Sequence, residues 1–253
     1  MEQSFKGREM MFDSQQLGLA FGPLYVSLFG HQKRMIEDEG RIASTLTVAL
    51  GASVSKICRV IVASDQNQEG FQLTKVADYT DFVRADGVVL TEPGSAALLQ
   101  TADCASGILY CPRTNRAVLF HGGRPALTPF CRQESGTCDW TVVETALQAV
   151  TKGGAKDDVV ALVIGNICGQ CFKHEHESAH HLAEPFLHLG EKVFADVENK
   201  ALDLYKVIKH RLMHAGVREE NISHTGPCTF ETPVLSSHRR GDTDRNTTVV
   251  VWR

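Results

Sequence analysis

The chain contains no long hydrophobic run, no block of basic residues and no low-complexity segment. No stretch approaches the ~18 consecutive apolar residues that a membrane-spanning helix requires. The 26 Lys and Arg residues are dispersed and outnumbered by 30 Asp and Glu residues, which argues against a protein dedicated to nucleic acids or membrane surfaces. Of the 253 residues, 43% are hydrophobic and 22% charged, which excludes disordered, collagen-like and coiled-coil chains. We expect a globular protein with no nucleic-acid or membrane partner.

Cysteine is sparse, with eight residues spread along the chain, unlike the dense disulfide framework of a small secreted domain. The N-terminal segment holds no apolar run long enough for a signal peptide. We therefore expect a cytoplasmic protein with reduced thiols. Such thiols can serve as core residues, metal ligands or nucleophiles.

Short apolar runs rich in Val and Ile alternate with longer amphipathic segments. The runs predict buried strands at 57–63, 87–91, 107–111, 117–121, 159–164 and 248–252. The connection between 107–111 and 117–121 has the length of a hairpin loop. Two apolar stripes predict helices, one through Trp140, Val143, Leu147 and Val150, the other from Val197 to Ala215 and ending at Gly216. No linker is visible, so the pattern predicts one mixed α/β domain over residues 1–253.

A first pair of candidate residues lies at the ends of two predicted strands. Cys104 precedes the strand 107–111, and His121 ends the next strand, seventeen residues later. If the two strands pair as a hairpin, the thiol and the imidazole can approach each other at the sheet edge. Thiolate and neutral imidazole are zinc ligands, and a Cys beside a His is also an activated nucleophile. A buried cysteine with an unrelated strand-end histidine is the simpler interpretation, and spacing alone favours it.

A second group is local and rich in Cys and His. Cys168 and Cys171 form a C-x2-C motif, which is followed by His174, His176, His180 and His181. The motif is typical of a metal site, but structural zinc sites usually place their two ligand pairs further apart in the sequence. The spacing therefore favours a solvated loop whose histidines carry no function over a structural metal site.

A third candidate is the basic segment Ser236–Gly241, which contains Arg239 and Arg240. Paired arginines in a loop can hold phosphate or carboxylate through bidentate hydrogen bonds, although charge pairs in loops are more often simply solvated. No Walker loop, dinucleotide-binding fingerprint or nucleophile-elbow motif occurs in the chain.

An ordered series of segments resembles the multicopper polyphenol oxidase or laccase-domain family, also called the YfiH family. The series runs from Gly22–Leu28 and Gly40–Arg41 near the start to Cys228–Thr229 and Ser237–Arg240 near the end. Between them lie the segments Asp86–Gly94, Gln100–Cys104, Val118–Gly123, Ile164–Cys171, Leu202–Leu204, Ala215–Val217 and Asn221–Ile222. Each motif is weak alone, but the ordered set is specific and spans nearly the whole chain.

The resemblance implies a single-domain mixed α/β sandwich, related to bacterial toxins that carry a Cys-His deamidase site. It also implies phosphorolysis of adenosine, inosine, guanosine or methylthioadenosine, or deamination of adenosine, at one zinc ion held by His, Cys and His. By matching of motifs, Cys104 and His121 take the second and third ligand positions. Arg41 takes the place of an arginine near the substrate, and Arg239 and Arg240 would help to bind phosphate.

The sequence departs from the family pattern at the implied site. Gln68 stands where the first histidine ligand belongs, and amide oxygen is a poorer zinc ligand than imidazole. Phe71 and Gln72 stand where a basic residue belongs, and the segment His121–Ala126 lacks the family's tryptophan. Glu69 or His31 could complete the ligand set in place of Gln68.

Three functional hypotheses follow. The first is a zinc-dependent purine nucleoside phosphorylase or adenosine deaminase, with a purine nucleoside and phosphate as its partners. The second is a metal-free thiol hydrolase, in which Cys104 is the nucleophile and His121 the base. The third is a binding or regulatory protein without turnover, as a homo-oligomer or paired with an active paralogue. A copper oxidase is disfavoured, because the chain lacks the clustered His pairs that several copper ions require.

Overall fold

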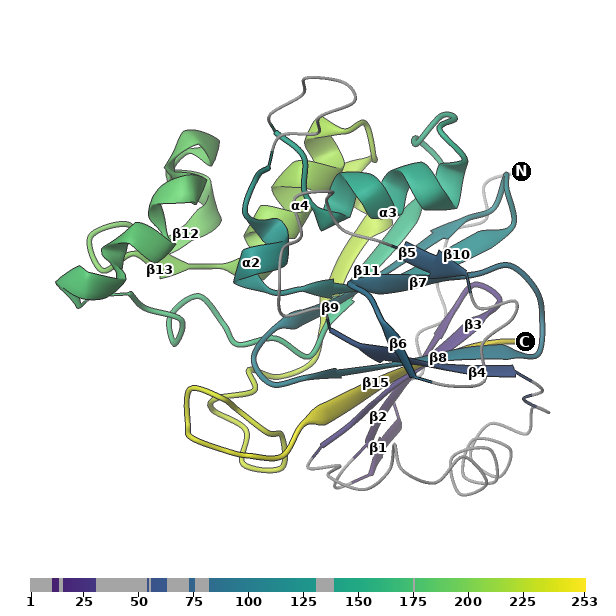
Figure 1. The fold of residues 1–253 in the computed structure, drawn as a ribbon, viewed down its shortest axis with the longest axis horizontal. Helices are drawn as coiled ribbons and strands as arrows, with labels where there is room; N and C mark the ends of the chain where they lie inside the picture. Colours follow the sequence, from purple (N-terminus) through teal and green to yellow (C-terminus); the bar gives the residue numbers. More distant parts are fainter. Residues whose placement is uncertain are drawn as a thin grey trace.

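The fold consists of two β-sheets packed face to face, with helices on the outer face of one sheet (Figure 1). The structure is a computed structural model, and it describes residues 11–13, 16–30, 54, 56–62, 73–75, 82–130, 139–174 and 176–253. This is the mixed α/β architecture that the sequence predicts. The assignment of all residues 1–253 to one domain stays a prediction. No helix in the described ranges combines the length and apolarity needed to cross a membrane.

The first sheet has seven strands in the order β1-β2-β3-β15-β8-β4-β6. They are β1 (Met11–Asp13), β2 (Gln16–Phe21), β3 (Leu24–Phe29), β4 (Lys56–Ile61), β6 (Phe82–Arg84), β8 (Ser95–Thr101) and β15 (Asn246–Trp252). The C-terminal strand β15 lies between β3 and β8, pairs antiparallel with both, and is buried along its whole length. The last segment of the chain is therefore a central strand of the sheet.

The second sheet has six strands in the order β14-β11-β9-β10-β7-β5. They are β5 (Leu73–Lys75), β7 (Gly87–Leu90), β9 (Ala105–Cys111), β10 (Arg116–Gly122), β11 (Val160–Ile164) and β14 (Ile222–Thr225). Strands β9 and β10 form the predicted antiparallel hairpin. A Cβ atom on Gly107 would lie 2.1 Å from Cζ of Phe120, its partner across the hairpin, so only glycine leaves room for this ring.

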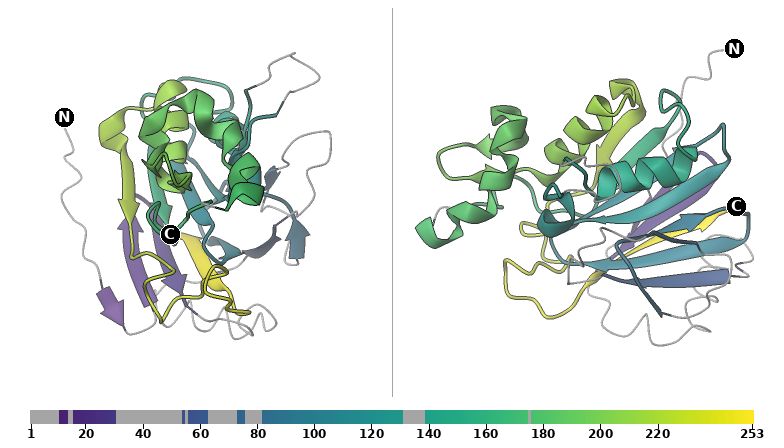
Figure 2. Two further views of the ribbon diagram at one scale, coloured as in Figure 1. Left: turned by 90° about the vertical axis from the view of Figure 1, so that its left-hand side faces the viewer. Right: turned by 45° about the horizontal axis from the view of Figure 1, so that its top comes forward.

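Three α-helices and four 3₁₀ helices complete the described fold, with one small hairpin. They are α2 (Arg124–Leu127), α3 (Val142–Thr151), α4 (Leu204–His214), η2 (Glu177–Leu182), η3 (Glu184–Leu189), η4 (Glu191–Val193) and η5 (Glu219–Asn221). The hairpin pairs β12 (Phe194–Asp196) with β13 (Ala201–Leu202). Figure 2 shows α3 and α4 side by side on the outer face of the second sheet.

The second predicted helix begins later than its apolar stripe indicates. The helix α4 starts at Leu204, because the side chain of Asp203 accepts a hydrogen bond from the backbone N–H of Lys206 at 3.1 Å and caps the helix. Val197 and Ala201 precede this cap, in the turn and second strand of the β12–β13 hairpin. Their apolar character serves a buried hairpin, which a helical spacing pattern cannot distinguish from a helix.

Two apolar layers hold the sandwich together. Leu28, Leu99, Ile108, Leu119 and Trp252 belong to the layer between the two sheets. The layer between the second sheet and the helices includes Leu109, Phe120, Val143, Leu147, Ile208 and Leu212. Because both faces of β9 and β10 are covered, the residues at their ends are held rigidly. This rigidity positions the candidate site.

Candidate active site

The candidate site lies where the chain crosses from one sheet to the other. Strand β8 ends at Thr101 in the first sheet, and β9 begins at Ala105 in the second. Between them, Asp103 has a φ of 77°, a left-handed conformation that Asp tolerates better than most residues. Strand β10 runs back along β9, with His121 opposite Ser106. The predicted hairpin thus brings His121 to the same end as Cys104.

The sulfur of Cys104 and a nitrogen of His121 both lie close to Gly123. A Cβ atom on Gly123 would lie 2.6 Å from Nε2 of His121 and 3.0 Å from Sγ of Cys104. These are the nitrogen and sulfur donors that zinc prefers. Two members of the implied ligand set therefore fit a metal ion. Among the described residues, no further His, Cys, Asp or Glu completes a group of three around them.

A buried carboxyl group lies opposite His121. The backbone N–H of His121 donates to the carbonyl oxygen of Asp86 at 2.7 Å, continuing the antiparallel pairing of β10 with β7. Oδ1 of Asp86 and Nδ1 of His121 are both buried without a hydrogen-bond partner in the described part of the chain. Residues directly opposite in such a pair present their side chains on the same face. A carboxylate in this position commonly orients a histidine that binds metal through its other nitrogen.

Asp86 is a candidate residue that the sequence did not single out. In the sequence, Asp86 was named only as the first residue of the segment Asp86–Gly94, which resembles the family. Its position just before an apolar strand was the available signal, but the register of β7 against β10 was needed to set it beside His121.

Burial changes the ionisation of the Cys104–His121 pair. Burial raises the pKa of Cys104 to about 11, with a smaller contribution from the charge of Asp103, and burial lowers the pKa of His121 to about 4. At neutral pH the thiol is protonated and the imidazole neutral. The thiol hydrolase hypothesis requires a depressed thiol pKa, and this structure has the opposite. A metal ion would instead stabilise the thiolate.

The stability of the metal-free protein should depend on pH through two opposing groups. Because the pKa of His121 is lowered from 6.5 to about 4, the unfolded chain takes up the proton before the folded protein does. The free energy of unfolding therefore falls as pH falls from about 6.5 to 4. Burial raises the pKa of Asp86 from 3.8 to about 6, so the unfolded chain releases this proton before the folded protein does. The free energy of unfolding therefore falls as pH rises through that range. We expect Asp86→Asn to gain stability relative to wild type as pH rises from 4 to 6. Urea unfolding in EDTA at several pH values measures this, and a relative loss would indicate an Asp86–His121 ion pair instead.

Cys104 lines a cavity of about 590 Å³, a volume typical of small-molecule sites. The wall includes Arg124, Phe172, His174, His238 and Arg239. Burial lowers the pKa of Arg124, which indicates a guanidinium partly withdrawn from water. The cavity therefore combines three cationic side chains, those of Arg124, Lys173 and Arg239, with the aromatic ring of Phe172 and the candidate metal ligand Cys104.

The two predicted phosphate-binding arginines differ in their surroundings. The guanidinium of Arg239 donates to the carbonyl oxygen of Lys173 at 2.9 Å and lies 5.4 Å from the ring centre of Phe172, at the cavity wall. The guanidinium of Arg240 donates to carbonyl groups of its own loop and to Asp242. Arg240 thus organises the loop, and a direct role in phosphate binding stays a prediction.

The histidines after Cys171 do not all lie in a solvated loop, so that sequence interpretation is wrong for His174. This side chain is 4% exposed and lines the cavity. Its Nδ1 lies 3.0 Å from the carbonyl oxygen of Lys200. Because a carbonyl oxygen only accepts, Nδ1 carries the hydrogen and donates it. Burial lowers the pKa of His174, so the neutral ring retains a lone pair on Nε2.

Two of the predicted site residues cannot be compared with the structure. Arg41 and Gln68 lie outside the described residues, as do the alternative ligands His31 and Glu69. The zinc ligand at the position of Gln68 and the role of Arg41 remain predictions.

Comparison with known sequences identifies the family. The sequence profile of the family described as multi-copper polyphenol oxidoreductase laccase matches residues 46–253. The chain belongs to this family. Over 172 residues it is 29% identical to the purine nucleoside phosphorylase SCO2081 of Streptomyces coelicolor. That match covers 67% of this chain and 64% of the relative's length, so the chain spans less than two thirds of this relative.

Solved structures share the fold. The YfiH protein of Bacillus licheniformis superposes with a TM-score of 0.69 at 16% identity, over 96% of this chain and 99% of that one. YlmD of Geobacillus stearothermophilus gives a TM-score of 0.68 at 17% identity, over 98% and 100% of the two chains. At identities this low, the structural likeness shows the fold alone. The predicted family resemblance is confirmed by the match to the family profile.

Proposed function

We propose that this laccase-domain protein is a zinc-dependent purine nucleoside phosphorylase or adenosine deaminase. The substrates would be adenosine, inosine, guanosine or methylthioadenosine, with phosphate as the second partner in phosphorolysis. The observation that carries the proposal is that Cys104 Sγ and His121 Nε2 both lie close to Gly123, and that Cys104 lines a cavity in the size range of small-molecule sites. The likeness to a purine nucleoside phosphorylase supports the choice of substrate class.

Cys104 and His121 would hold the zinc ion, with Gln68 or a neighbouring group as the third ligand. A bound zinc ion would supply Lewis acidity and lower the pKa of a coordinated water. Asp86 would accept a hydrogen bond from Nδ1 of His121 and so keep Nε2 free as a metal ligand. This arrangement would give partners to both buried atoms that otherwise have none in the described residues.

The cavity wall would bind the substrate. Arg124 and Arg239 bring positive charge that suits phosphate. Phe172 and the planar guanidinium of Arg239 offer stacking surfaces for a purine base. His174 would exchange a proton with the substrate through Nε2, because its Nδ1 is engaged by the carbonyl of Lys200. In phosphorolysis the bond from base to ribose breaks, the ribose carbon bonds to a phosphate oxygen, and the base takes up a proton.

A non-catalytic nucleoside-binding protein is the second candidate. It is favoured by the lack of a third ligand around Cys104 and His121 among the described residues. Association as a homo-oligomer or with an active paralogue, and a cytoplasmic location, belong to the proposal in either case.

The test is turnover and zinc content of the untagged protein, beside Cys104→Ala and the control Cys58→Ala. Cys58 is also a buried cysteine but lies in β4, away from the cavity residues. We expect wild type and the control to release base and ribose 1-phosphate in the presence of phosphate, or ammonia without it, and Cys104→Ala to do neither. Nucleoside binding without product would support the non-catalytic candidate. Metal-free hydrolysis with selective iodoacetamide labelling of Cys104 would restore the thiol hydrolase.

A further inference from the structure

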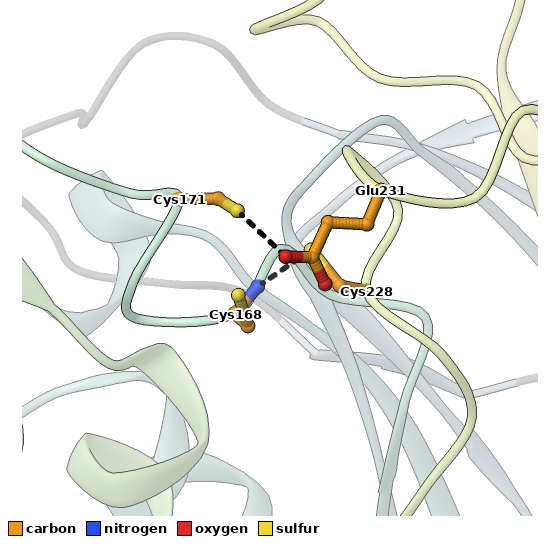
Figure 3. A group of neighbouring side chains, drawn as sticks. All are labelled: Cys168, Cys171, Cys228 and Glu231. Carbon is orange, nitrogen blue, oxygen red and sulfur yellow. Dashed lines mark hydrogen bonds between the residues drawn. The ribbon is translucent and has the colours of Figure 1, made fainter.

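A second group of metal-ligand side chains lies at the end of the parallel strands β11 and β14. The two strands pair from Ala161 opposite Ile222 to Ile164 opposite Thr225. Because parallel strands end at the same edge of a sheet, the loops that follow them begin side by side. Cys168 and Cys171 are in the first loop, and Cys228 and Glu231 are in the second (Figure 3). The sequence grouped the two cysteines with the histidines that follow them, whereas the structure groups them with Cys228 and Glu231.

The four side chains are close enough to share one ion. Their ligand atoms, three sulfurs and one carboxylate oxygen, all lie within 4.8 Å of one another. In a tetrahedral site with zinc–sulfur bonds of about 2.3 Å, neighbouring sulfurs are separated by about 3.8 Å. The group therefore has to contract by about 1 Å or less to bind zinc, which side-chain rotation can supply.

The contacts within the group are ones that a metal ion could use or displace. The backbone N–H of Cys168 donates to Sγ of Cys228 at 3.2 Å, and Sγ of Cys171 donates to Oε1 of Glu231 at 3.5 Å (Figure 3). An N–H bond to sulfur stabilises a thiolate, and a proton held between a thiol and a carboxylate is what a metal ion displaces. Three sulfur donors select a thiophilic ion such as zinc over magnesium or calcium, which prefer oxygen donors only.

We propose that Cys168, Cys171, Cys228 and Glu231 form a structural zinc site, separate from the site at Cys104 and His121. A closed set of four protein ligands leaves no open position, so the ion would serve the fold and not the reaction. The ion would link the loop after β11 to the loop after β14, which otherwise start side by side because their strands pair.

The site would also stabilise one wall of the cavity. Phe172, which lines the cavity, directly follows the ligand Cys171. Thr229 directly follows the ligand Cys228, and its hydroxyl donates to Oδ1 of Asp103 at 2.6 Å, next to Cys104. Both chain segments enter the candidate active site within one residue of a zinc ligand. Loss of the ion should therefore loosen the wall and weaken substrate binding.

The decisive sample is Cys104→Ala, which removes the other candidate zinc site. We expect this variant to retain about one zinc per chain, and X-ray absorption to show three sulfur neighbours at about 2.3 Å. Adding Cys228→Ser should remove the zinc, whereas adding the control Cys58→Ala should not. Failure of the proposed purine activity would leave these results unchanged, so the two proposals fail separately.

A milder variant tests the site if the serine variant does not fold. Glu231 is exposed, so Glu231→Gln removes the carboxylate charge without disturbing the core. We expect zinc affinity of the site, measured by competition with a chromogenic chelator, to fall at least about 10-fold. The proposal is overturned if Cys104→Ala holds no zinc, if its zinc survives Cys228→Ser, or if freshly purified protein shows a Cys168–Cys171 disulfide by alkylation and mass spectrometry.

Discussion

Replacing Gly123 by alanine is expected to remove zinc from the Cys104–His121 site and to lower kcat/KM about 100-fold. The new methyl group would lie 2.5 Å from Cε1 and 2.6 Å from Nε2 of His121, and 3.0 Å from Sγ of Cys104. It would press on both ligand side chains and displace them from their present positions. His121 is 8% exposed and has little space in which to move aside.

The backbone itself should accept this substitution. Gly123 has φ −78° and ψ 159°, an extended conformation open to any residue. Gly154→Ala is the matched control, because Gly154 is exposed and its Cβ would meet only a carbonyl oxygen at 3.2 Å. We expect the control to retain zinc and turnover and to change stability by no more than about 0.5 kcal/mol. Zinc content, turnover and urea unfolding of both variants are the measurements. If Gly123→Ala keeps full zinc and turnover, Cys104 and His121 do not hold the metal ion.

Replacing Asp103 by alanine is expected to cause the largest loss of stability among the site residues. The buried carboxylate accepts hydrogen bonds from the hydroxyl of Thr229 at 2.6 Å, the hydroxyl of Ser237 at 3.1 Å and the backbone N–H of Arg239 at 2.7 Å. Alanine would leave these donors without their acceptor and would strain the left-handed backbone. We expect the free energy of unfolding to fall by about 3–5 kcal/mol.

Asp103→Asn separates the charge from the shape of this side chain. Asparagine tolerates the left-handed backbone and keeps one oxygen acceptor, so its loss should be smaller than that of alanine. Asp157→Ala is the control, since Asp157 pairs with Arg113 only at the surface, and such pairs contribute about 0–1 kcal/mol. Urea unfolding at constant pH gives the three values. A loss for Asp103→Ala no larger than that for Asp157→Ala would show that Asp103 does not hold the C-terminal loop.

The local patterns of the sequence predicted much of the fold. The apolar runs predicted the strands β7, β9, β10, β11 and β15 to within two residues at each end. These runs are informative because a strand buried on both faces must be apolar throughout. The turn between β9 and β10 is short, so the hairpin and the approach of His121 to Cys104 also followed from the sequence. Helix α4 was placed too early, since a buried hairpin and a helix can share apolar spacing.

The contacts that only the tertiary structure decided join segments far apart in the chain. The spacing of residues in the sequence could not place Asp86 opposite His121, because neither strand's own sequence determines the register of β7 against β10. It could not bring Cys228 to Cys168 and Cys171, because their approach depends on the parallel pairing of β11 with β14. Residue types and local turns thus determined which donors this protein carries. Long-range strand pairing decided which donors meet, because hydrogen bonding and burial are satisfied only in the assembled sheets.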